Sequence, residues 1–265
     1  MFLQCSIQGE TQDTKQRTDM LNQQPSLYVF NCMIRFITTC LLIALLQACA
    51  KKQTPVNYTP INPTSSSSKT FLALGDSYTI GQGVTAAERF PHQTVAWLKL
   101  NGVDVATPTY IATTGWTTGS LQYAIETNKP ATHDVVTVLI GVNDQYQTHD
   151  TTNYRLRFTQ LLEKAIQLAK GKKQNVFVLS IPDYSVTPFA SGSDTARIRL
   201  EIDWFNAINK NVTASYLVAY LDITPSYREG RYDRTLIAAD GLHPSGLEYK
   251  KWAERLGALM LGVLK

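Results

Sequence analysis

The stretch FLALGDSYTIGQG, residues 71–83, sets the question that the rest of the chain must answer. An apolar run typical of a buried strand ends abruptly at Gly75-Asp76-Ser77, and a glycine-bearing loop follows. Two explanations fit this pattern. The tripeptide can be an ordinary turn, or Ser77 can be a nucleophile presented at the end of a parallel strand.

Strand-like and helix-like segments alternate after residue 70. The expected strands are short, rich in β-branched or aromatic residues and bounded by Gly, Pro, Asn or Asp; they span 70–74, 103–111, 135–140, 176–181 and 218–223. Apolar periodicity and flanking Pro or Gly predict helices over 91–100, shortly after Thr118, and over 153–170, 194–213 and 246–264. This alternation predicts an α/β fold, in which helices cover both faces of a parallel sheet.

Polar clusters follow several of the expected strands. They are 75–77, 113–116 and 141–144 after the first three strands, and 240–245 between the fifth strand and the last helix. Ligands of parallel sheets bind beyond the carboxyl ends of the strands. We therefore expect these four clusters to meet at one edge of the sheet.

The residue types in these clusters suit nucleophilic catalysis. A serine hydroxyl attacks a carbonyl only when a base takes its proton, and a histidine oriented by a carboxylate does so near neutral pH. The negative charge that develops on the carbonyl oxygen needs fixed hydrogen-bond donors, each contributing about 3–4 kcal/mol to lowering the barrier. The candidates are Ser77, the pair Asp240 and His243, and donors near Gly115 and Asn143.

The four clusters in this order resemble the sequence blocks of the SGNH (GDSL) hydrolases, over essentially all of residues 70–265. The resemblance implies a three-layer α/β/α sandwich with a five-stranded parallel, flavodoxin-like sheet. It implies Ser77 as the nucleophile, His243 as the general base and acid, and Asp240 as the residue that orients His243. It also implies an oxyanion hole made of the backbone N–H groups of Ser77 and Gly115 and the side-chain amide of Asn143, with neither cofactor nor metal.

Several residues near the clusters keep two interpretations. Tyr78 stands where many members of the family have leucine, and with Trp116 and Tyr146 it either lines the substrate pocket or packs in the core. Asp144 either braces Asn143 or caps a turn. The other histidines, His92, His133 and His149, form no pair with metal-ligand spacing, so we expect structural or solvent-facing roles for them.

The N-terminal part of the sequence resembles a bacterial lipoprotein precursor. Residues 33–49 combine one basic residue, a short apolar run and the ending Leu-Gln-Ala-Cys, which is similar to a lipobox with Cys49 as the lipidated residue. An uncleaved signal anchor or a buried helix is the alternative. We interpret residues 1–32 as a misassigned start or a disordered segment, and the Pro-, Thr- and Ser-rich residues 50–69 as a flexible tether.

Composition sets the remaining expectations. With 44% hydrophobic residues the chain can build a core, and a net charge of +4 without a long basic block argues against a nucleic-acid partner. No cysteine follows Cys49, so the domain contains no disulfide. We predict a monomeric serine esterase, anchored by lipid in the cell envelope with the outer membrane or surface favoured, that prefers small acyl groups. The alternatives are a lysophospholipase, thioesterase or carbohydrate deacetylase, or a noncatalytic lipoprotein that binds glycans or lipids.

Overall fold

A computed structural model describes residues 68–265 of the protein. The predicted signal peptide, Cys49 and nearly all of the predicted tether lie outside the described residues. In the described part no helix has the length and apolar character needed to cross a bilayer.

The centre of the fold is a five-stranded sheet in the order β2-β1-β3-β4-β5. Every neighbouring pair of strands is parallel. The strands are β1 (Phe71–Gly75), β2 (Thr109–Ala112), β3 (Val135–Leu139), β4 (Val176–Leu179) and β5 (Ala219–Leu221). This is the flavodoxin-like strand order, so the predicted fold class is confirmed.

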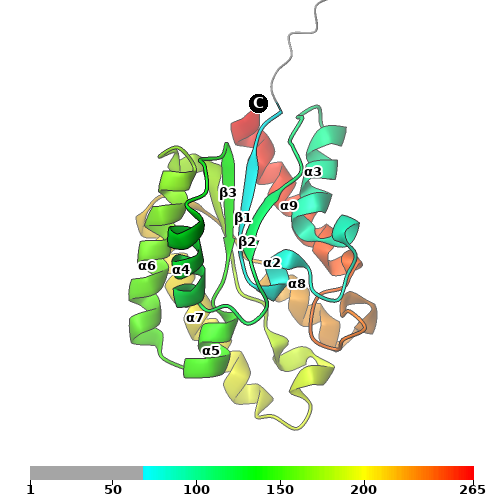
Figure 1. The fold of residues 1–265 in the computed structure, drawn as a ribbon. Coiled ribbons are helices and arrows are strands. Elements are labelled where there is room, and N and C mark those ends of the chain that lie inside the picture. Colours follow the sequence, from blue (N-terminus) through cyan, green and yellow to red (C-terminus); the bar gives the residue numbers. More distant parts are fainter. Residues whose placement is uncertain (1–67) are drawn as a thin grey trace, which may run out of the picture. The chain divides into compact units, whose positions relative to one another are not determined.

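Helices cover both faces of the sheet, which makes three layers (Figure 1). One face carries α3 (Phe90–Leu100) and α9 (Gly246–Leu264). The other carries α4 (Thr118–Asn128), α6 (Thr151–Leu168) and α7 (Thr195–Ser215). Short helices follow three of the strands at their carboxyl ends: α2 (Ser77–Ile80), α5 (Val142–Thr148) and α8 (Thr224–Arg228). The 3-10 turns are η1 (Ala86–Glu88), η2 (Lys173–Asn175), η3 (Tyr184–Val186), η4 (Pro188–Ala190), η5 (Glu229–Arg231) and η6 (Arg234–Leu236).

The central strands are apolar on both faces because helices cover both. All residues of β1, β3 and β4 are buried, which explains why these strands, apart from Thr137 in β3, are apolar throughout rather than alternating. The fully buried Trp252 of α9 packs with Phe90 of α3, the two ring centroids lying 6.2 Å apart. This packing covers the face of the sheet behind β1, the strand that carries Ser77 at its end.

The second strand is shorter than the sequence predicts. Of residues 103–111 only the last three belong to β2, and Val105 forms a single isolated bridge with Lys69. Pro108 lies just before β2 and has no N–H to extend a ladder. The other predicted strands and helices begin and end within two residues of the observed ones, whereas the short helices α2, α5 and α8 were not predicted.

Candidate active site

The turn after β1 brings Ser77 to the carboxyl edge of the sheet. A Cβ atom on Gly75 would overlap Thr79 and the carbonyl of Leu139, so only glycine fits where the chain leaves the strand. Asp76 caps α2, because its Oδ1 accepts a hydrogen bond of 3.0 Å from the N–H of Tyr78. Ser77 is the first residue of this helix and is buried.

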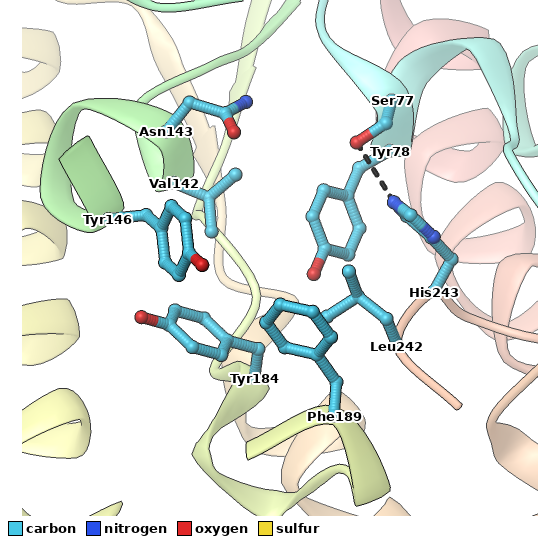
Figure 2. Close-up of a pocket in the computed structure, with 9 residues that line it drawn as sticks. All are labelled: Ser77, Tyr78, Val142, Asn143, Tyr146, Tyr184, Phe189, Leu242 and His243. Carbon is cyan, nitrogen blue, oxygen red and sulfur yellow. Dashed lines mark hydrogen bonds between the residues drawn. The ribbon is translucent and has the colours of Figure 1, made fainter. Parts of the chain in front are cut away.

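Ser77, His243 and Asp240 lie in one line of hydrogen bonds. His243 Nε2 is 2.9 Å from the Oγ of Ser77 (Figure 2), and His243 Nδ1 is 2.6 Å from Oδ2 of Asp240. The other carboxylate oxygen of Asp240 accepts the backbone N–H groups of Leu242 and His243, each at 3.0 Å. The loop therefore folds back on its own aspartate, and this turn aims the imidazole at Ser77.

The protonation states suit a base and its orienting carboxylate. Burial lowers the pKa of His243 below its usual 6.5, although Asp240 opposes this shift. Burial alone would raise the pKa of Asp240, but the two backbone N–H groups and the imidazole outweigh it and hold the pKa below 3.8. Near neutral pH the imidazole is thus neutral and the aspartate is ionised.

The two further candidate donors, Gly115 and Asn143, lie on segments that hydrogen bonds join to each other. Gly115 has a φ of +81° and open space around its Cα, a conformation that favours glycine. Asn143 lies in the first turn of α5, and its Nδ2 donates to the carbonyl of Trp116 at 3.0 Å. Gln147 of the same helix donates to the carbonyl of Gly115, also at 3.0 Å. These two bonds attach the Gly115 loop to α5 and fix the two sets of donors relative to each other.

Asp76 lies behind the donors and is completely buried. Burial raises the pKa of Asp76 to about 8, despite the hydrogen bonds from the N–H of Tyr78 and, at 3.4 Å, from the amide of Asn143. The carboxyl group is therefore mainly neutral at pH 7. The group that faces the amide of Asn143 is thus mainly uncharged.

Asp144 plays neither of the roles considered for it. Its carboxylate is buried and accepts the N–H and the hydroxyl of Thr118, at 2.8 and 2.6 Å, and Arg157 lies 3.4 Å from it. The amide of Asn143 instead contacts Trp116 and Asp76. Asp144 therefore joins α5 to the start of α4. Sequence alone could not show this, because the partner of Asp144 is decided by how α4 and α5 meet.

A small cavity of about 90 Å³ opens beside Ser77 (Figure 2). Apart from Ser77, Asn143 and His243, its lining is apolar and aromatic: Tyr78, Val142, Tyr146, Tyr184, Phe189 and Leu242. The rings of Tyr146, Tyr184 and Phe189 pack against one another with centroids 6.0–6.2 Å apart. Tyr146 and Phe189 are about half exposed, so the cavity is open to solvent on their side.

Sequence reasoning missed the segment that carries Tyr184 and Phe189. One signal in the sequence could have identified this segment as part of the site. It directly follows β4 and therefore lies at the same edge of the sheet as the four polar clusters. Asp183 is buried, caps η3 and forms a 2.7 Å ion pair with Arg228. The N–H of Phe189 donates to the carbonyl of Gly241 at 3.0 Å, which ties the segment to the loop that bears His243.

Two of the three aromatic residues with open roles lie in the cavity. Tyr78 and Tyr146 line it, whereas the side chain of Trp116 borders a separate groove along α4 with Ser120 and Tyr123. Trp116 contributes to the site only through its carbonyl, which holds the Asn143 amide.

The remaining histidines make local contacts away from Ser77. His92 bonds the hydroxyl of Tyr110 at 2.7 Å, His133 bonds the carbonyl of Ala131 at 2.8 Å, and His149 bonds Glu201 at 2.6 Å. Within residues 68–265 no three His, Cys, Asp or Glu side chains are grouped as a metal site requires.

Comparisons with known proteins agree with this geometry. A family model described as "GDSL-like Lipase/Acylhydrolase family" matches residues 73–251. A search of curated proteins found no match. The fold is similar to that of a lipase/acylhydrolase from Enterococcus faecalis, with 20% identity, a TM-score of 0.56, and coverage of 74% of this chain and 97% of that one. The fold is similar to that of TesA as well, with 20% identity, a TM-score of 0.56, and coverage of 74% of this chain and all of that one. The fold is also similar to that of Axe2, an acetylxylan esterase from Geobacillus stearothermophilus, with 18% identity, a TM-score of 0.54, and coverage of 72% of this chain and 94% of that one.

Sequence identities this low show similarity of fold alone, so the match to the family model decides which family the chain belongs to. The chain belongs to the GDSL-like lipase/acylhydrolase family and is a hydrolase of ester bonds.

Proposed function

We propose that the protein hydrolyses carboxylic esters of small acyl groups through an acyl-serine intermediate. The observation that carries this proposal is the line from Ser77 through His243 to Asp240, with contacts of 2.9 and 2.6 Å, beside a cavity of about 90 Å³. Such a line supplies a nucleophile, a base and an orienting carboxylate.

In the first half-reaction the Oγ of Ser77 attacks the ester carbonyl as its proton passes to Nε2 of His243. The carbonyl oxygen becomes an oxyanion, which accepts hydrogen bonds from the N–H groups of Ser77 and Gly115 and from the amide of Asn143. The amide hydrogen used is the one that makes the long 3.4 Å contact with Asp76 in the free enzyme, since the other is held by the carbonyl of Trp116. The tetrahedral intermediate then breaks its bond to the alcohol oxygen, which leaves with the proton from Nε2. The products of this step are the free alcohol and the acyl ester of Ser77.

In the second half-reaction a water molecule attacks the acyl carbonyl and gives one proton to Nε2 of His243. The second tetrahedral intermediate releases the carboxylic acid, and the proton on Nε2 returns to the Oγ of Ser77. Asp240 stays ionised throughout and stabilises the imidazolium that forms in each half.

The size of the cavity supports the preference for small acyl groups. A cavity of roughly 150 Å³ accommodates benzene, so about 90 Å³ suits an acetyl or propionyl group better than a long chain. The packed rings of Tyr184 and Phe189 form part of the apolar wall available to the acyl group. Acetyl esters of carbohydrates are a second candidate, favoured by the same cavity size.

A panel of p-nitrophenyl esters from acetate to palmitate tests the proposal. We expect turnover to be highest for acetate to butyrate and to fall steeply beyond hexanoate. Ser77→Ala should abolish the turnover of every ester, since it removes the nucleophile. Equal rates for the wild type and Ser77→Ala would favour the noncatalytic binding protein, and a maximum at palmitate would refute the small acyl preference.

We also propose that Cys49 carries the lipid that anchors the protein in the cell envelope. The support is the apolar run and lipobox-like ending of residues 33–49. Metabolic labelling with a radioactive or alkyne-bearing fatty acid should mark the protein, and Cys49→Ala should lose the label. Labelling that survives this substitution would contradict the proposal.

A further inference from the structure

Tyr78 packs directly against the imidazole of His243. The two ring centroids are 4.9 Å apart and the ring planes are tilted by 54°, within the range of packed aromatic pairs. Figure 2 shows the tyrosine ring beside the imidazole, on the cavity side of the line from Ser77 to His243. Leucine, common at this position in the family that the sequence resembles, offers no such flat surface.

Tyr78 itself is held firmly. Its N–H donates to Asp76 at 3.0 Å and its carbonyl accepts the hydroxyl of Tyr249 at 2.9 Å. The ring of Tyr227 meets the Tyr78 ring edge-on at 6.2 Å, and the hydroxyl of Tyr227 donates to the carbonyl of Leu242, the neighbour of His243. A buried group of tyrosines thus fixes the surface against which the imidazole lies. The ring of Tyr78 is the part of the side chain that packs against the imidazole, with its centroid 4.9 Å from that of His243.

The need for this surface follows from the two half-reactions. In the free enzyme the imidazole is attached at both nitrogens, to Asp240 through Nδ1 and to Ser77 through Nε2. Acylation replaces the hydrogen on the serine oxygen with an acyl group, so Nε2 loses its donor. The imidazole then keeps one hydrogen bond, from Nδ1 to Asp240. The ring can rotate away from Ser77 unless another side chain packs against it.

We propose that Tyr78 is a positioning residue that keeps the imidazole of His243 in place while Ser77 is acylated, so that Nε2 is ready to accept a proton from the attacking water. The inference rests on the proposed function for its kinetic consequence, and it predicts that deacylation depends on the tyrosine ring more than acylation does.

Stopped-flow hydrolysis of p-nitrophenyl acetate provides the kinetic test. Losing an aromatic contact of this kind corresponds to a factor of about 2–10 in rate. We expect Tyr78→Leu to lower kcat by that factor and to lower kcat/KM less. An initial burst of p-nitrophenol should approach one equivalent per enzyme, because the acyl-enzyme accumulates. Tyr78→Phe keeps the aromatic ring, so its kcat should be close to that of the wild type.

Phe158→Leu is the matched control. Phe158 is fully buried in α6, so this variant also exchanges a core aromatic residue for leucine, but it should lose stability without a change in kcat or in the burst. If Tyr78→Leu lowers only the melting temperature, the residue is ordinary packing and the proposal fails. If it changes only KM, the ring is a wall of the cavity and the proposal also fails.

A structural test does not depend on turnover. Ser77→Ala removes the partner of Nε2, as acylation removes its hydrogen. Crystal structures of Ser77→Ala and of Ser77→Ala combined with Tyr78→Leu should show the imidazole in place in the first and displaced or in two orientations in the second. An imidazole that stays in place in both would overturn the proposal. A wild type without esterase activity would refute the proposed function and leave this comparison as the deciding test.

Discussion

Replacing Asp240 with asparagine tests the orientation of the catalytic histidine with little change in shape. In the structure Oδ1 of Asp240 accepts two backbone N–H groups, and Oδ2 accepts the proton on Nδ1 of His243. An asparagine can keep its carbonyl oxygen toward the backbone donors and so preserve the loop. Its amide nitrogen then faces Nδ1 and donates to it. The imidazole is forced to carry its hydrogen on Nε2, where it can no longer take the proton of Ser77.

The structure also sets the size of the expected effect. Forcing the wrong tautomer in a buried triad lowers kcat by about 10⁴, or about 5 kcal/mol of barrier. The side chain of Asp240 is 30% exposed, against 3% for His243. Water can therefore partly replace the carboxylate, and we expect a loss of about 10³ in kcat with KM nearly unchanged.

The assay is the hydrolysis of p-nitrophenyl acetate at pH 7.5, with unfolding in urea to confirm that the variant is folded. Asp233→Asn is the matched control, because Asp233 also caps a turn, accepting the N–H of Thr235 at 3.0 Å, but contacts no histidine. The control should keep full activity. A loss of less than about fivefold in Asp240→Asn would refute the reasoning, since the carboxylate would then not determine the tautomer.

Three further predictions concern the donors and the buried charges. Asn143→Ala should lower kcat by about 10²–10³ with little change in KM, because it removes one oxyanion donor; a loss below tenfold in steady-state assays would mean that the amide does not face the oxyanion. The pH profile of kcat/KM should bend at a pH below 6.5, because burial lowers the pKa of His243 and its neutral form is the base; an inflection above pH 7 would contradict this assignment. Asp76→Asn should be more stable than the wild type by an amount that grows between about pH 4 and pH 8. The carboxyl is neutral in the folded protein and ionised in the unfolded chain over that range, so wild-type stability falls as pH rises there. Urea unfolding at several pH values measures this, and a difference independent of pH would show that Asp76 has an ordinary pKa.

Most of the fold and the reacting groups could be predicted from the sequence. The apolar runs of β1 and β3 and the periodicity of α6 and α9 depend on neighbours along the chain, so they are visible without a structure. The polar clusters that contain Ser77 and Asn143 follow β1 and β3 directly, and the cluster that contains His243 directly precedes α9. Parallel strands place such clusters at one edge of the sheet. This rule predicted that Ser77 and His243, 166 positions apart in the chain, lie together, and the structure shows them in contact at 2.9 Å.

Contacts that depend on how helices and edge segments pack could not be predicted in the same way. Nothing near Asp144 indicates that it binds Thr118 rather than Asn143, since the partner is decided by how α4 and α5 meet. The true extent of β2 depended on Pro108 and on pairing with β1 alone, as the edge strand has one neighbour.

What the sequence by itself determined is the chemistry: a serine, a histidine, an aspartate and neutral donors at the ends of parallel strands, because these depend on residue type and on local pattern. What only the tertiary structure decided is the surroundings of that chemistry. The small aromatic cavity depends on how the segment of Tyr184 and Phe189 packs against the loop of His243, and the support of the imidazole depends on the ring of Tyr78. Side chains pack against whatever the folded chain brings within a few ångströms, and that is a property of the whole core rather than of any stretch of sequence.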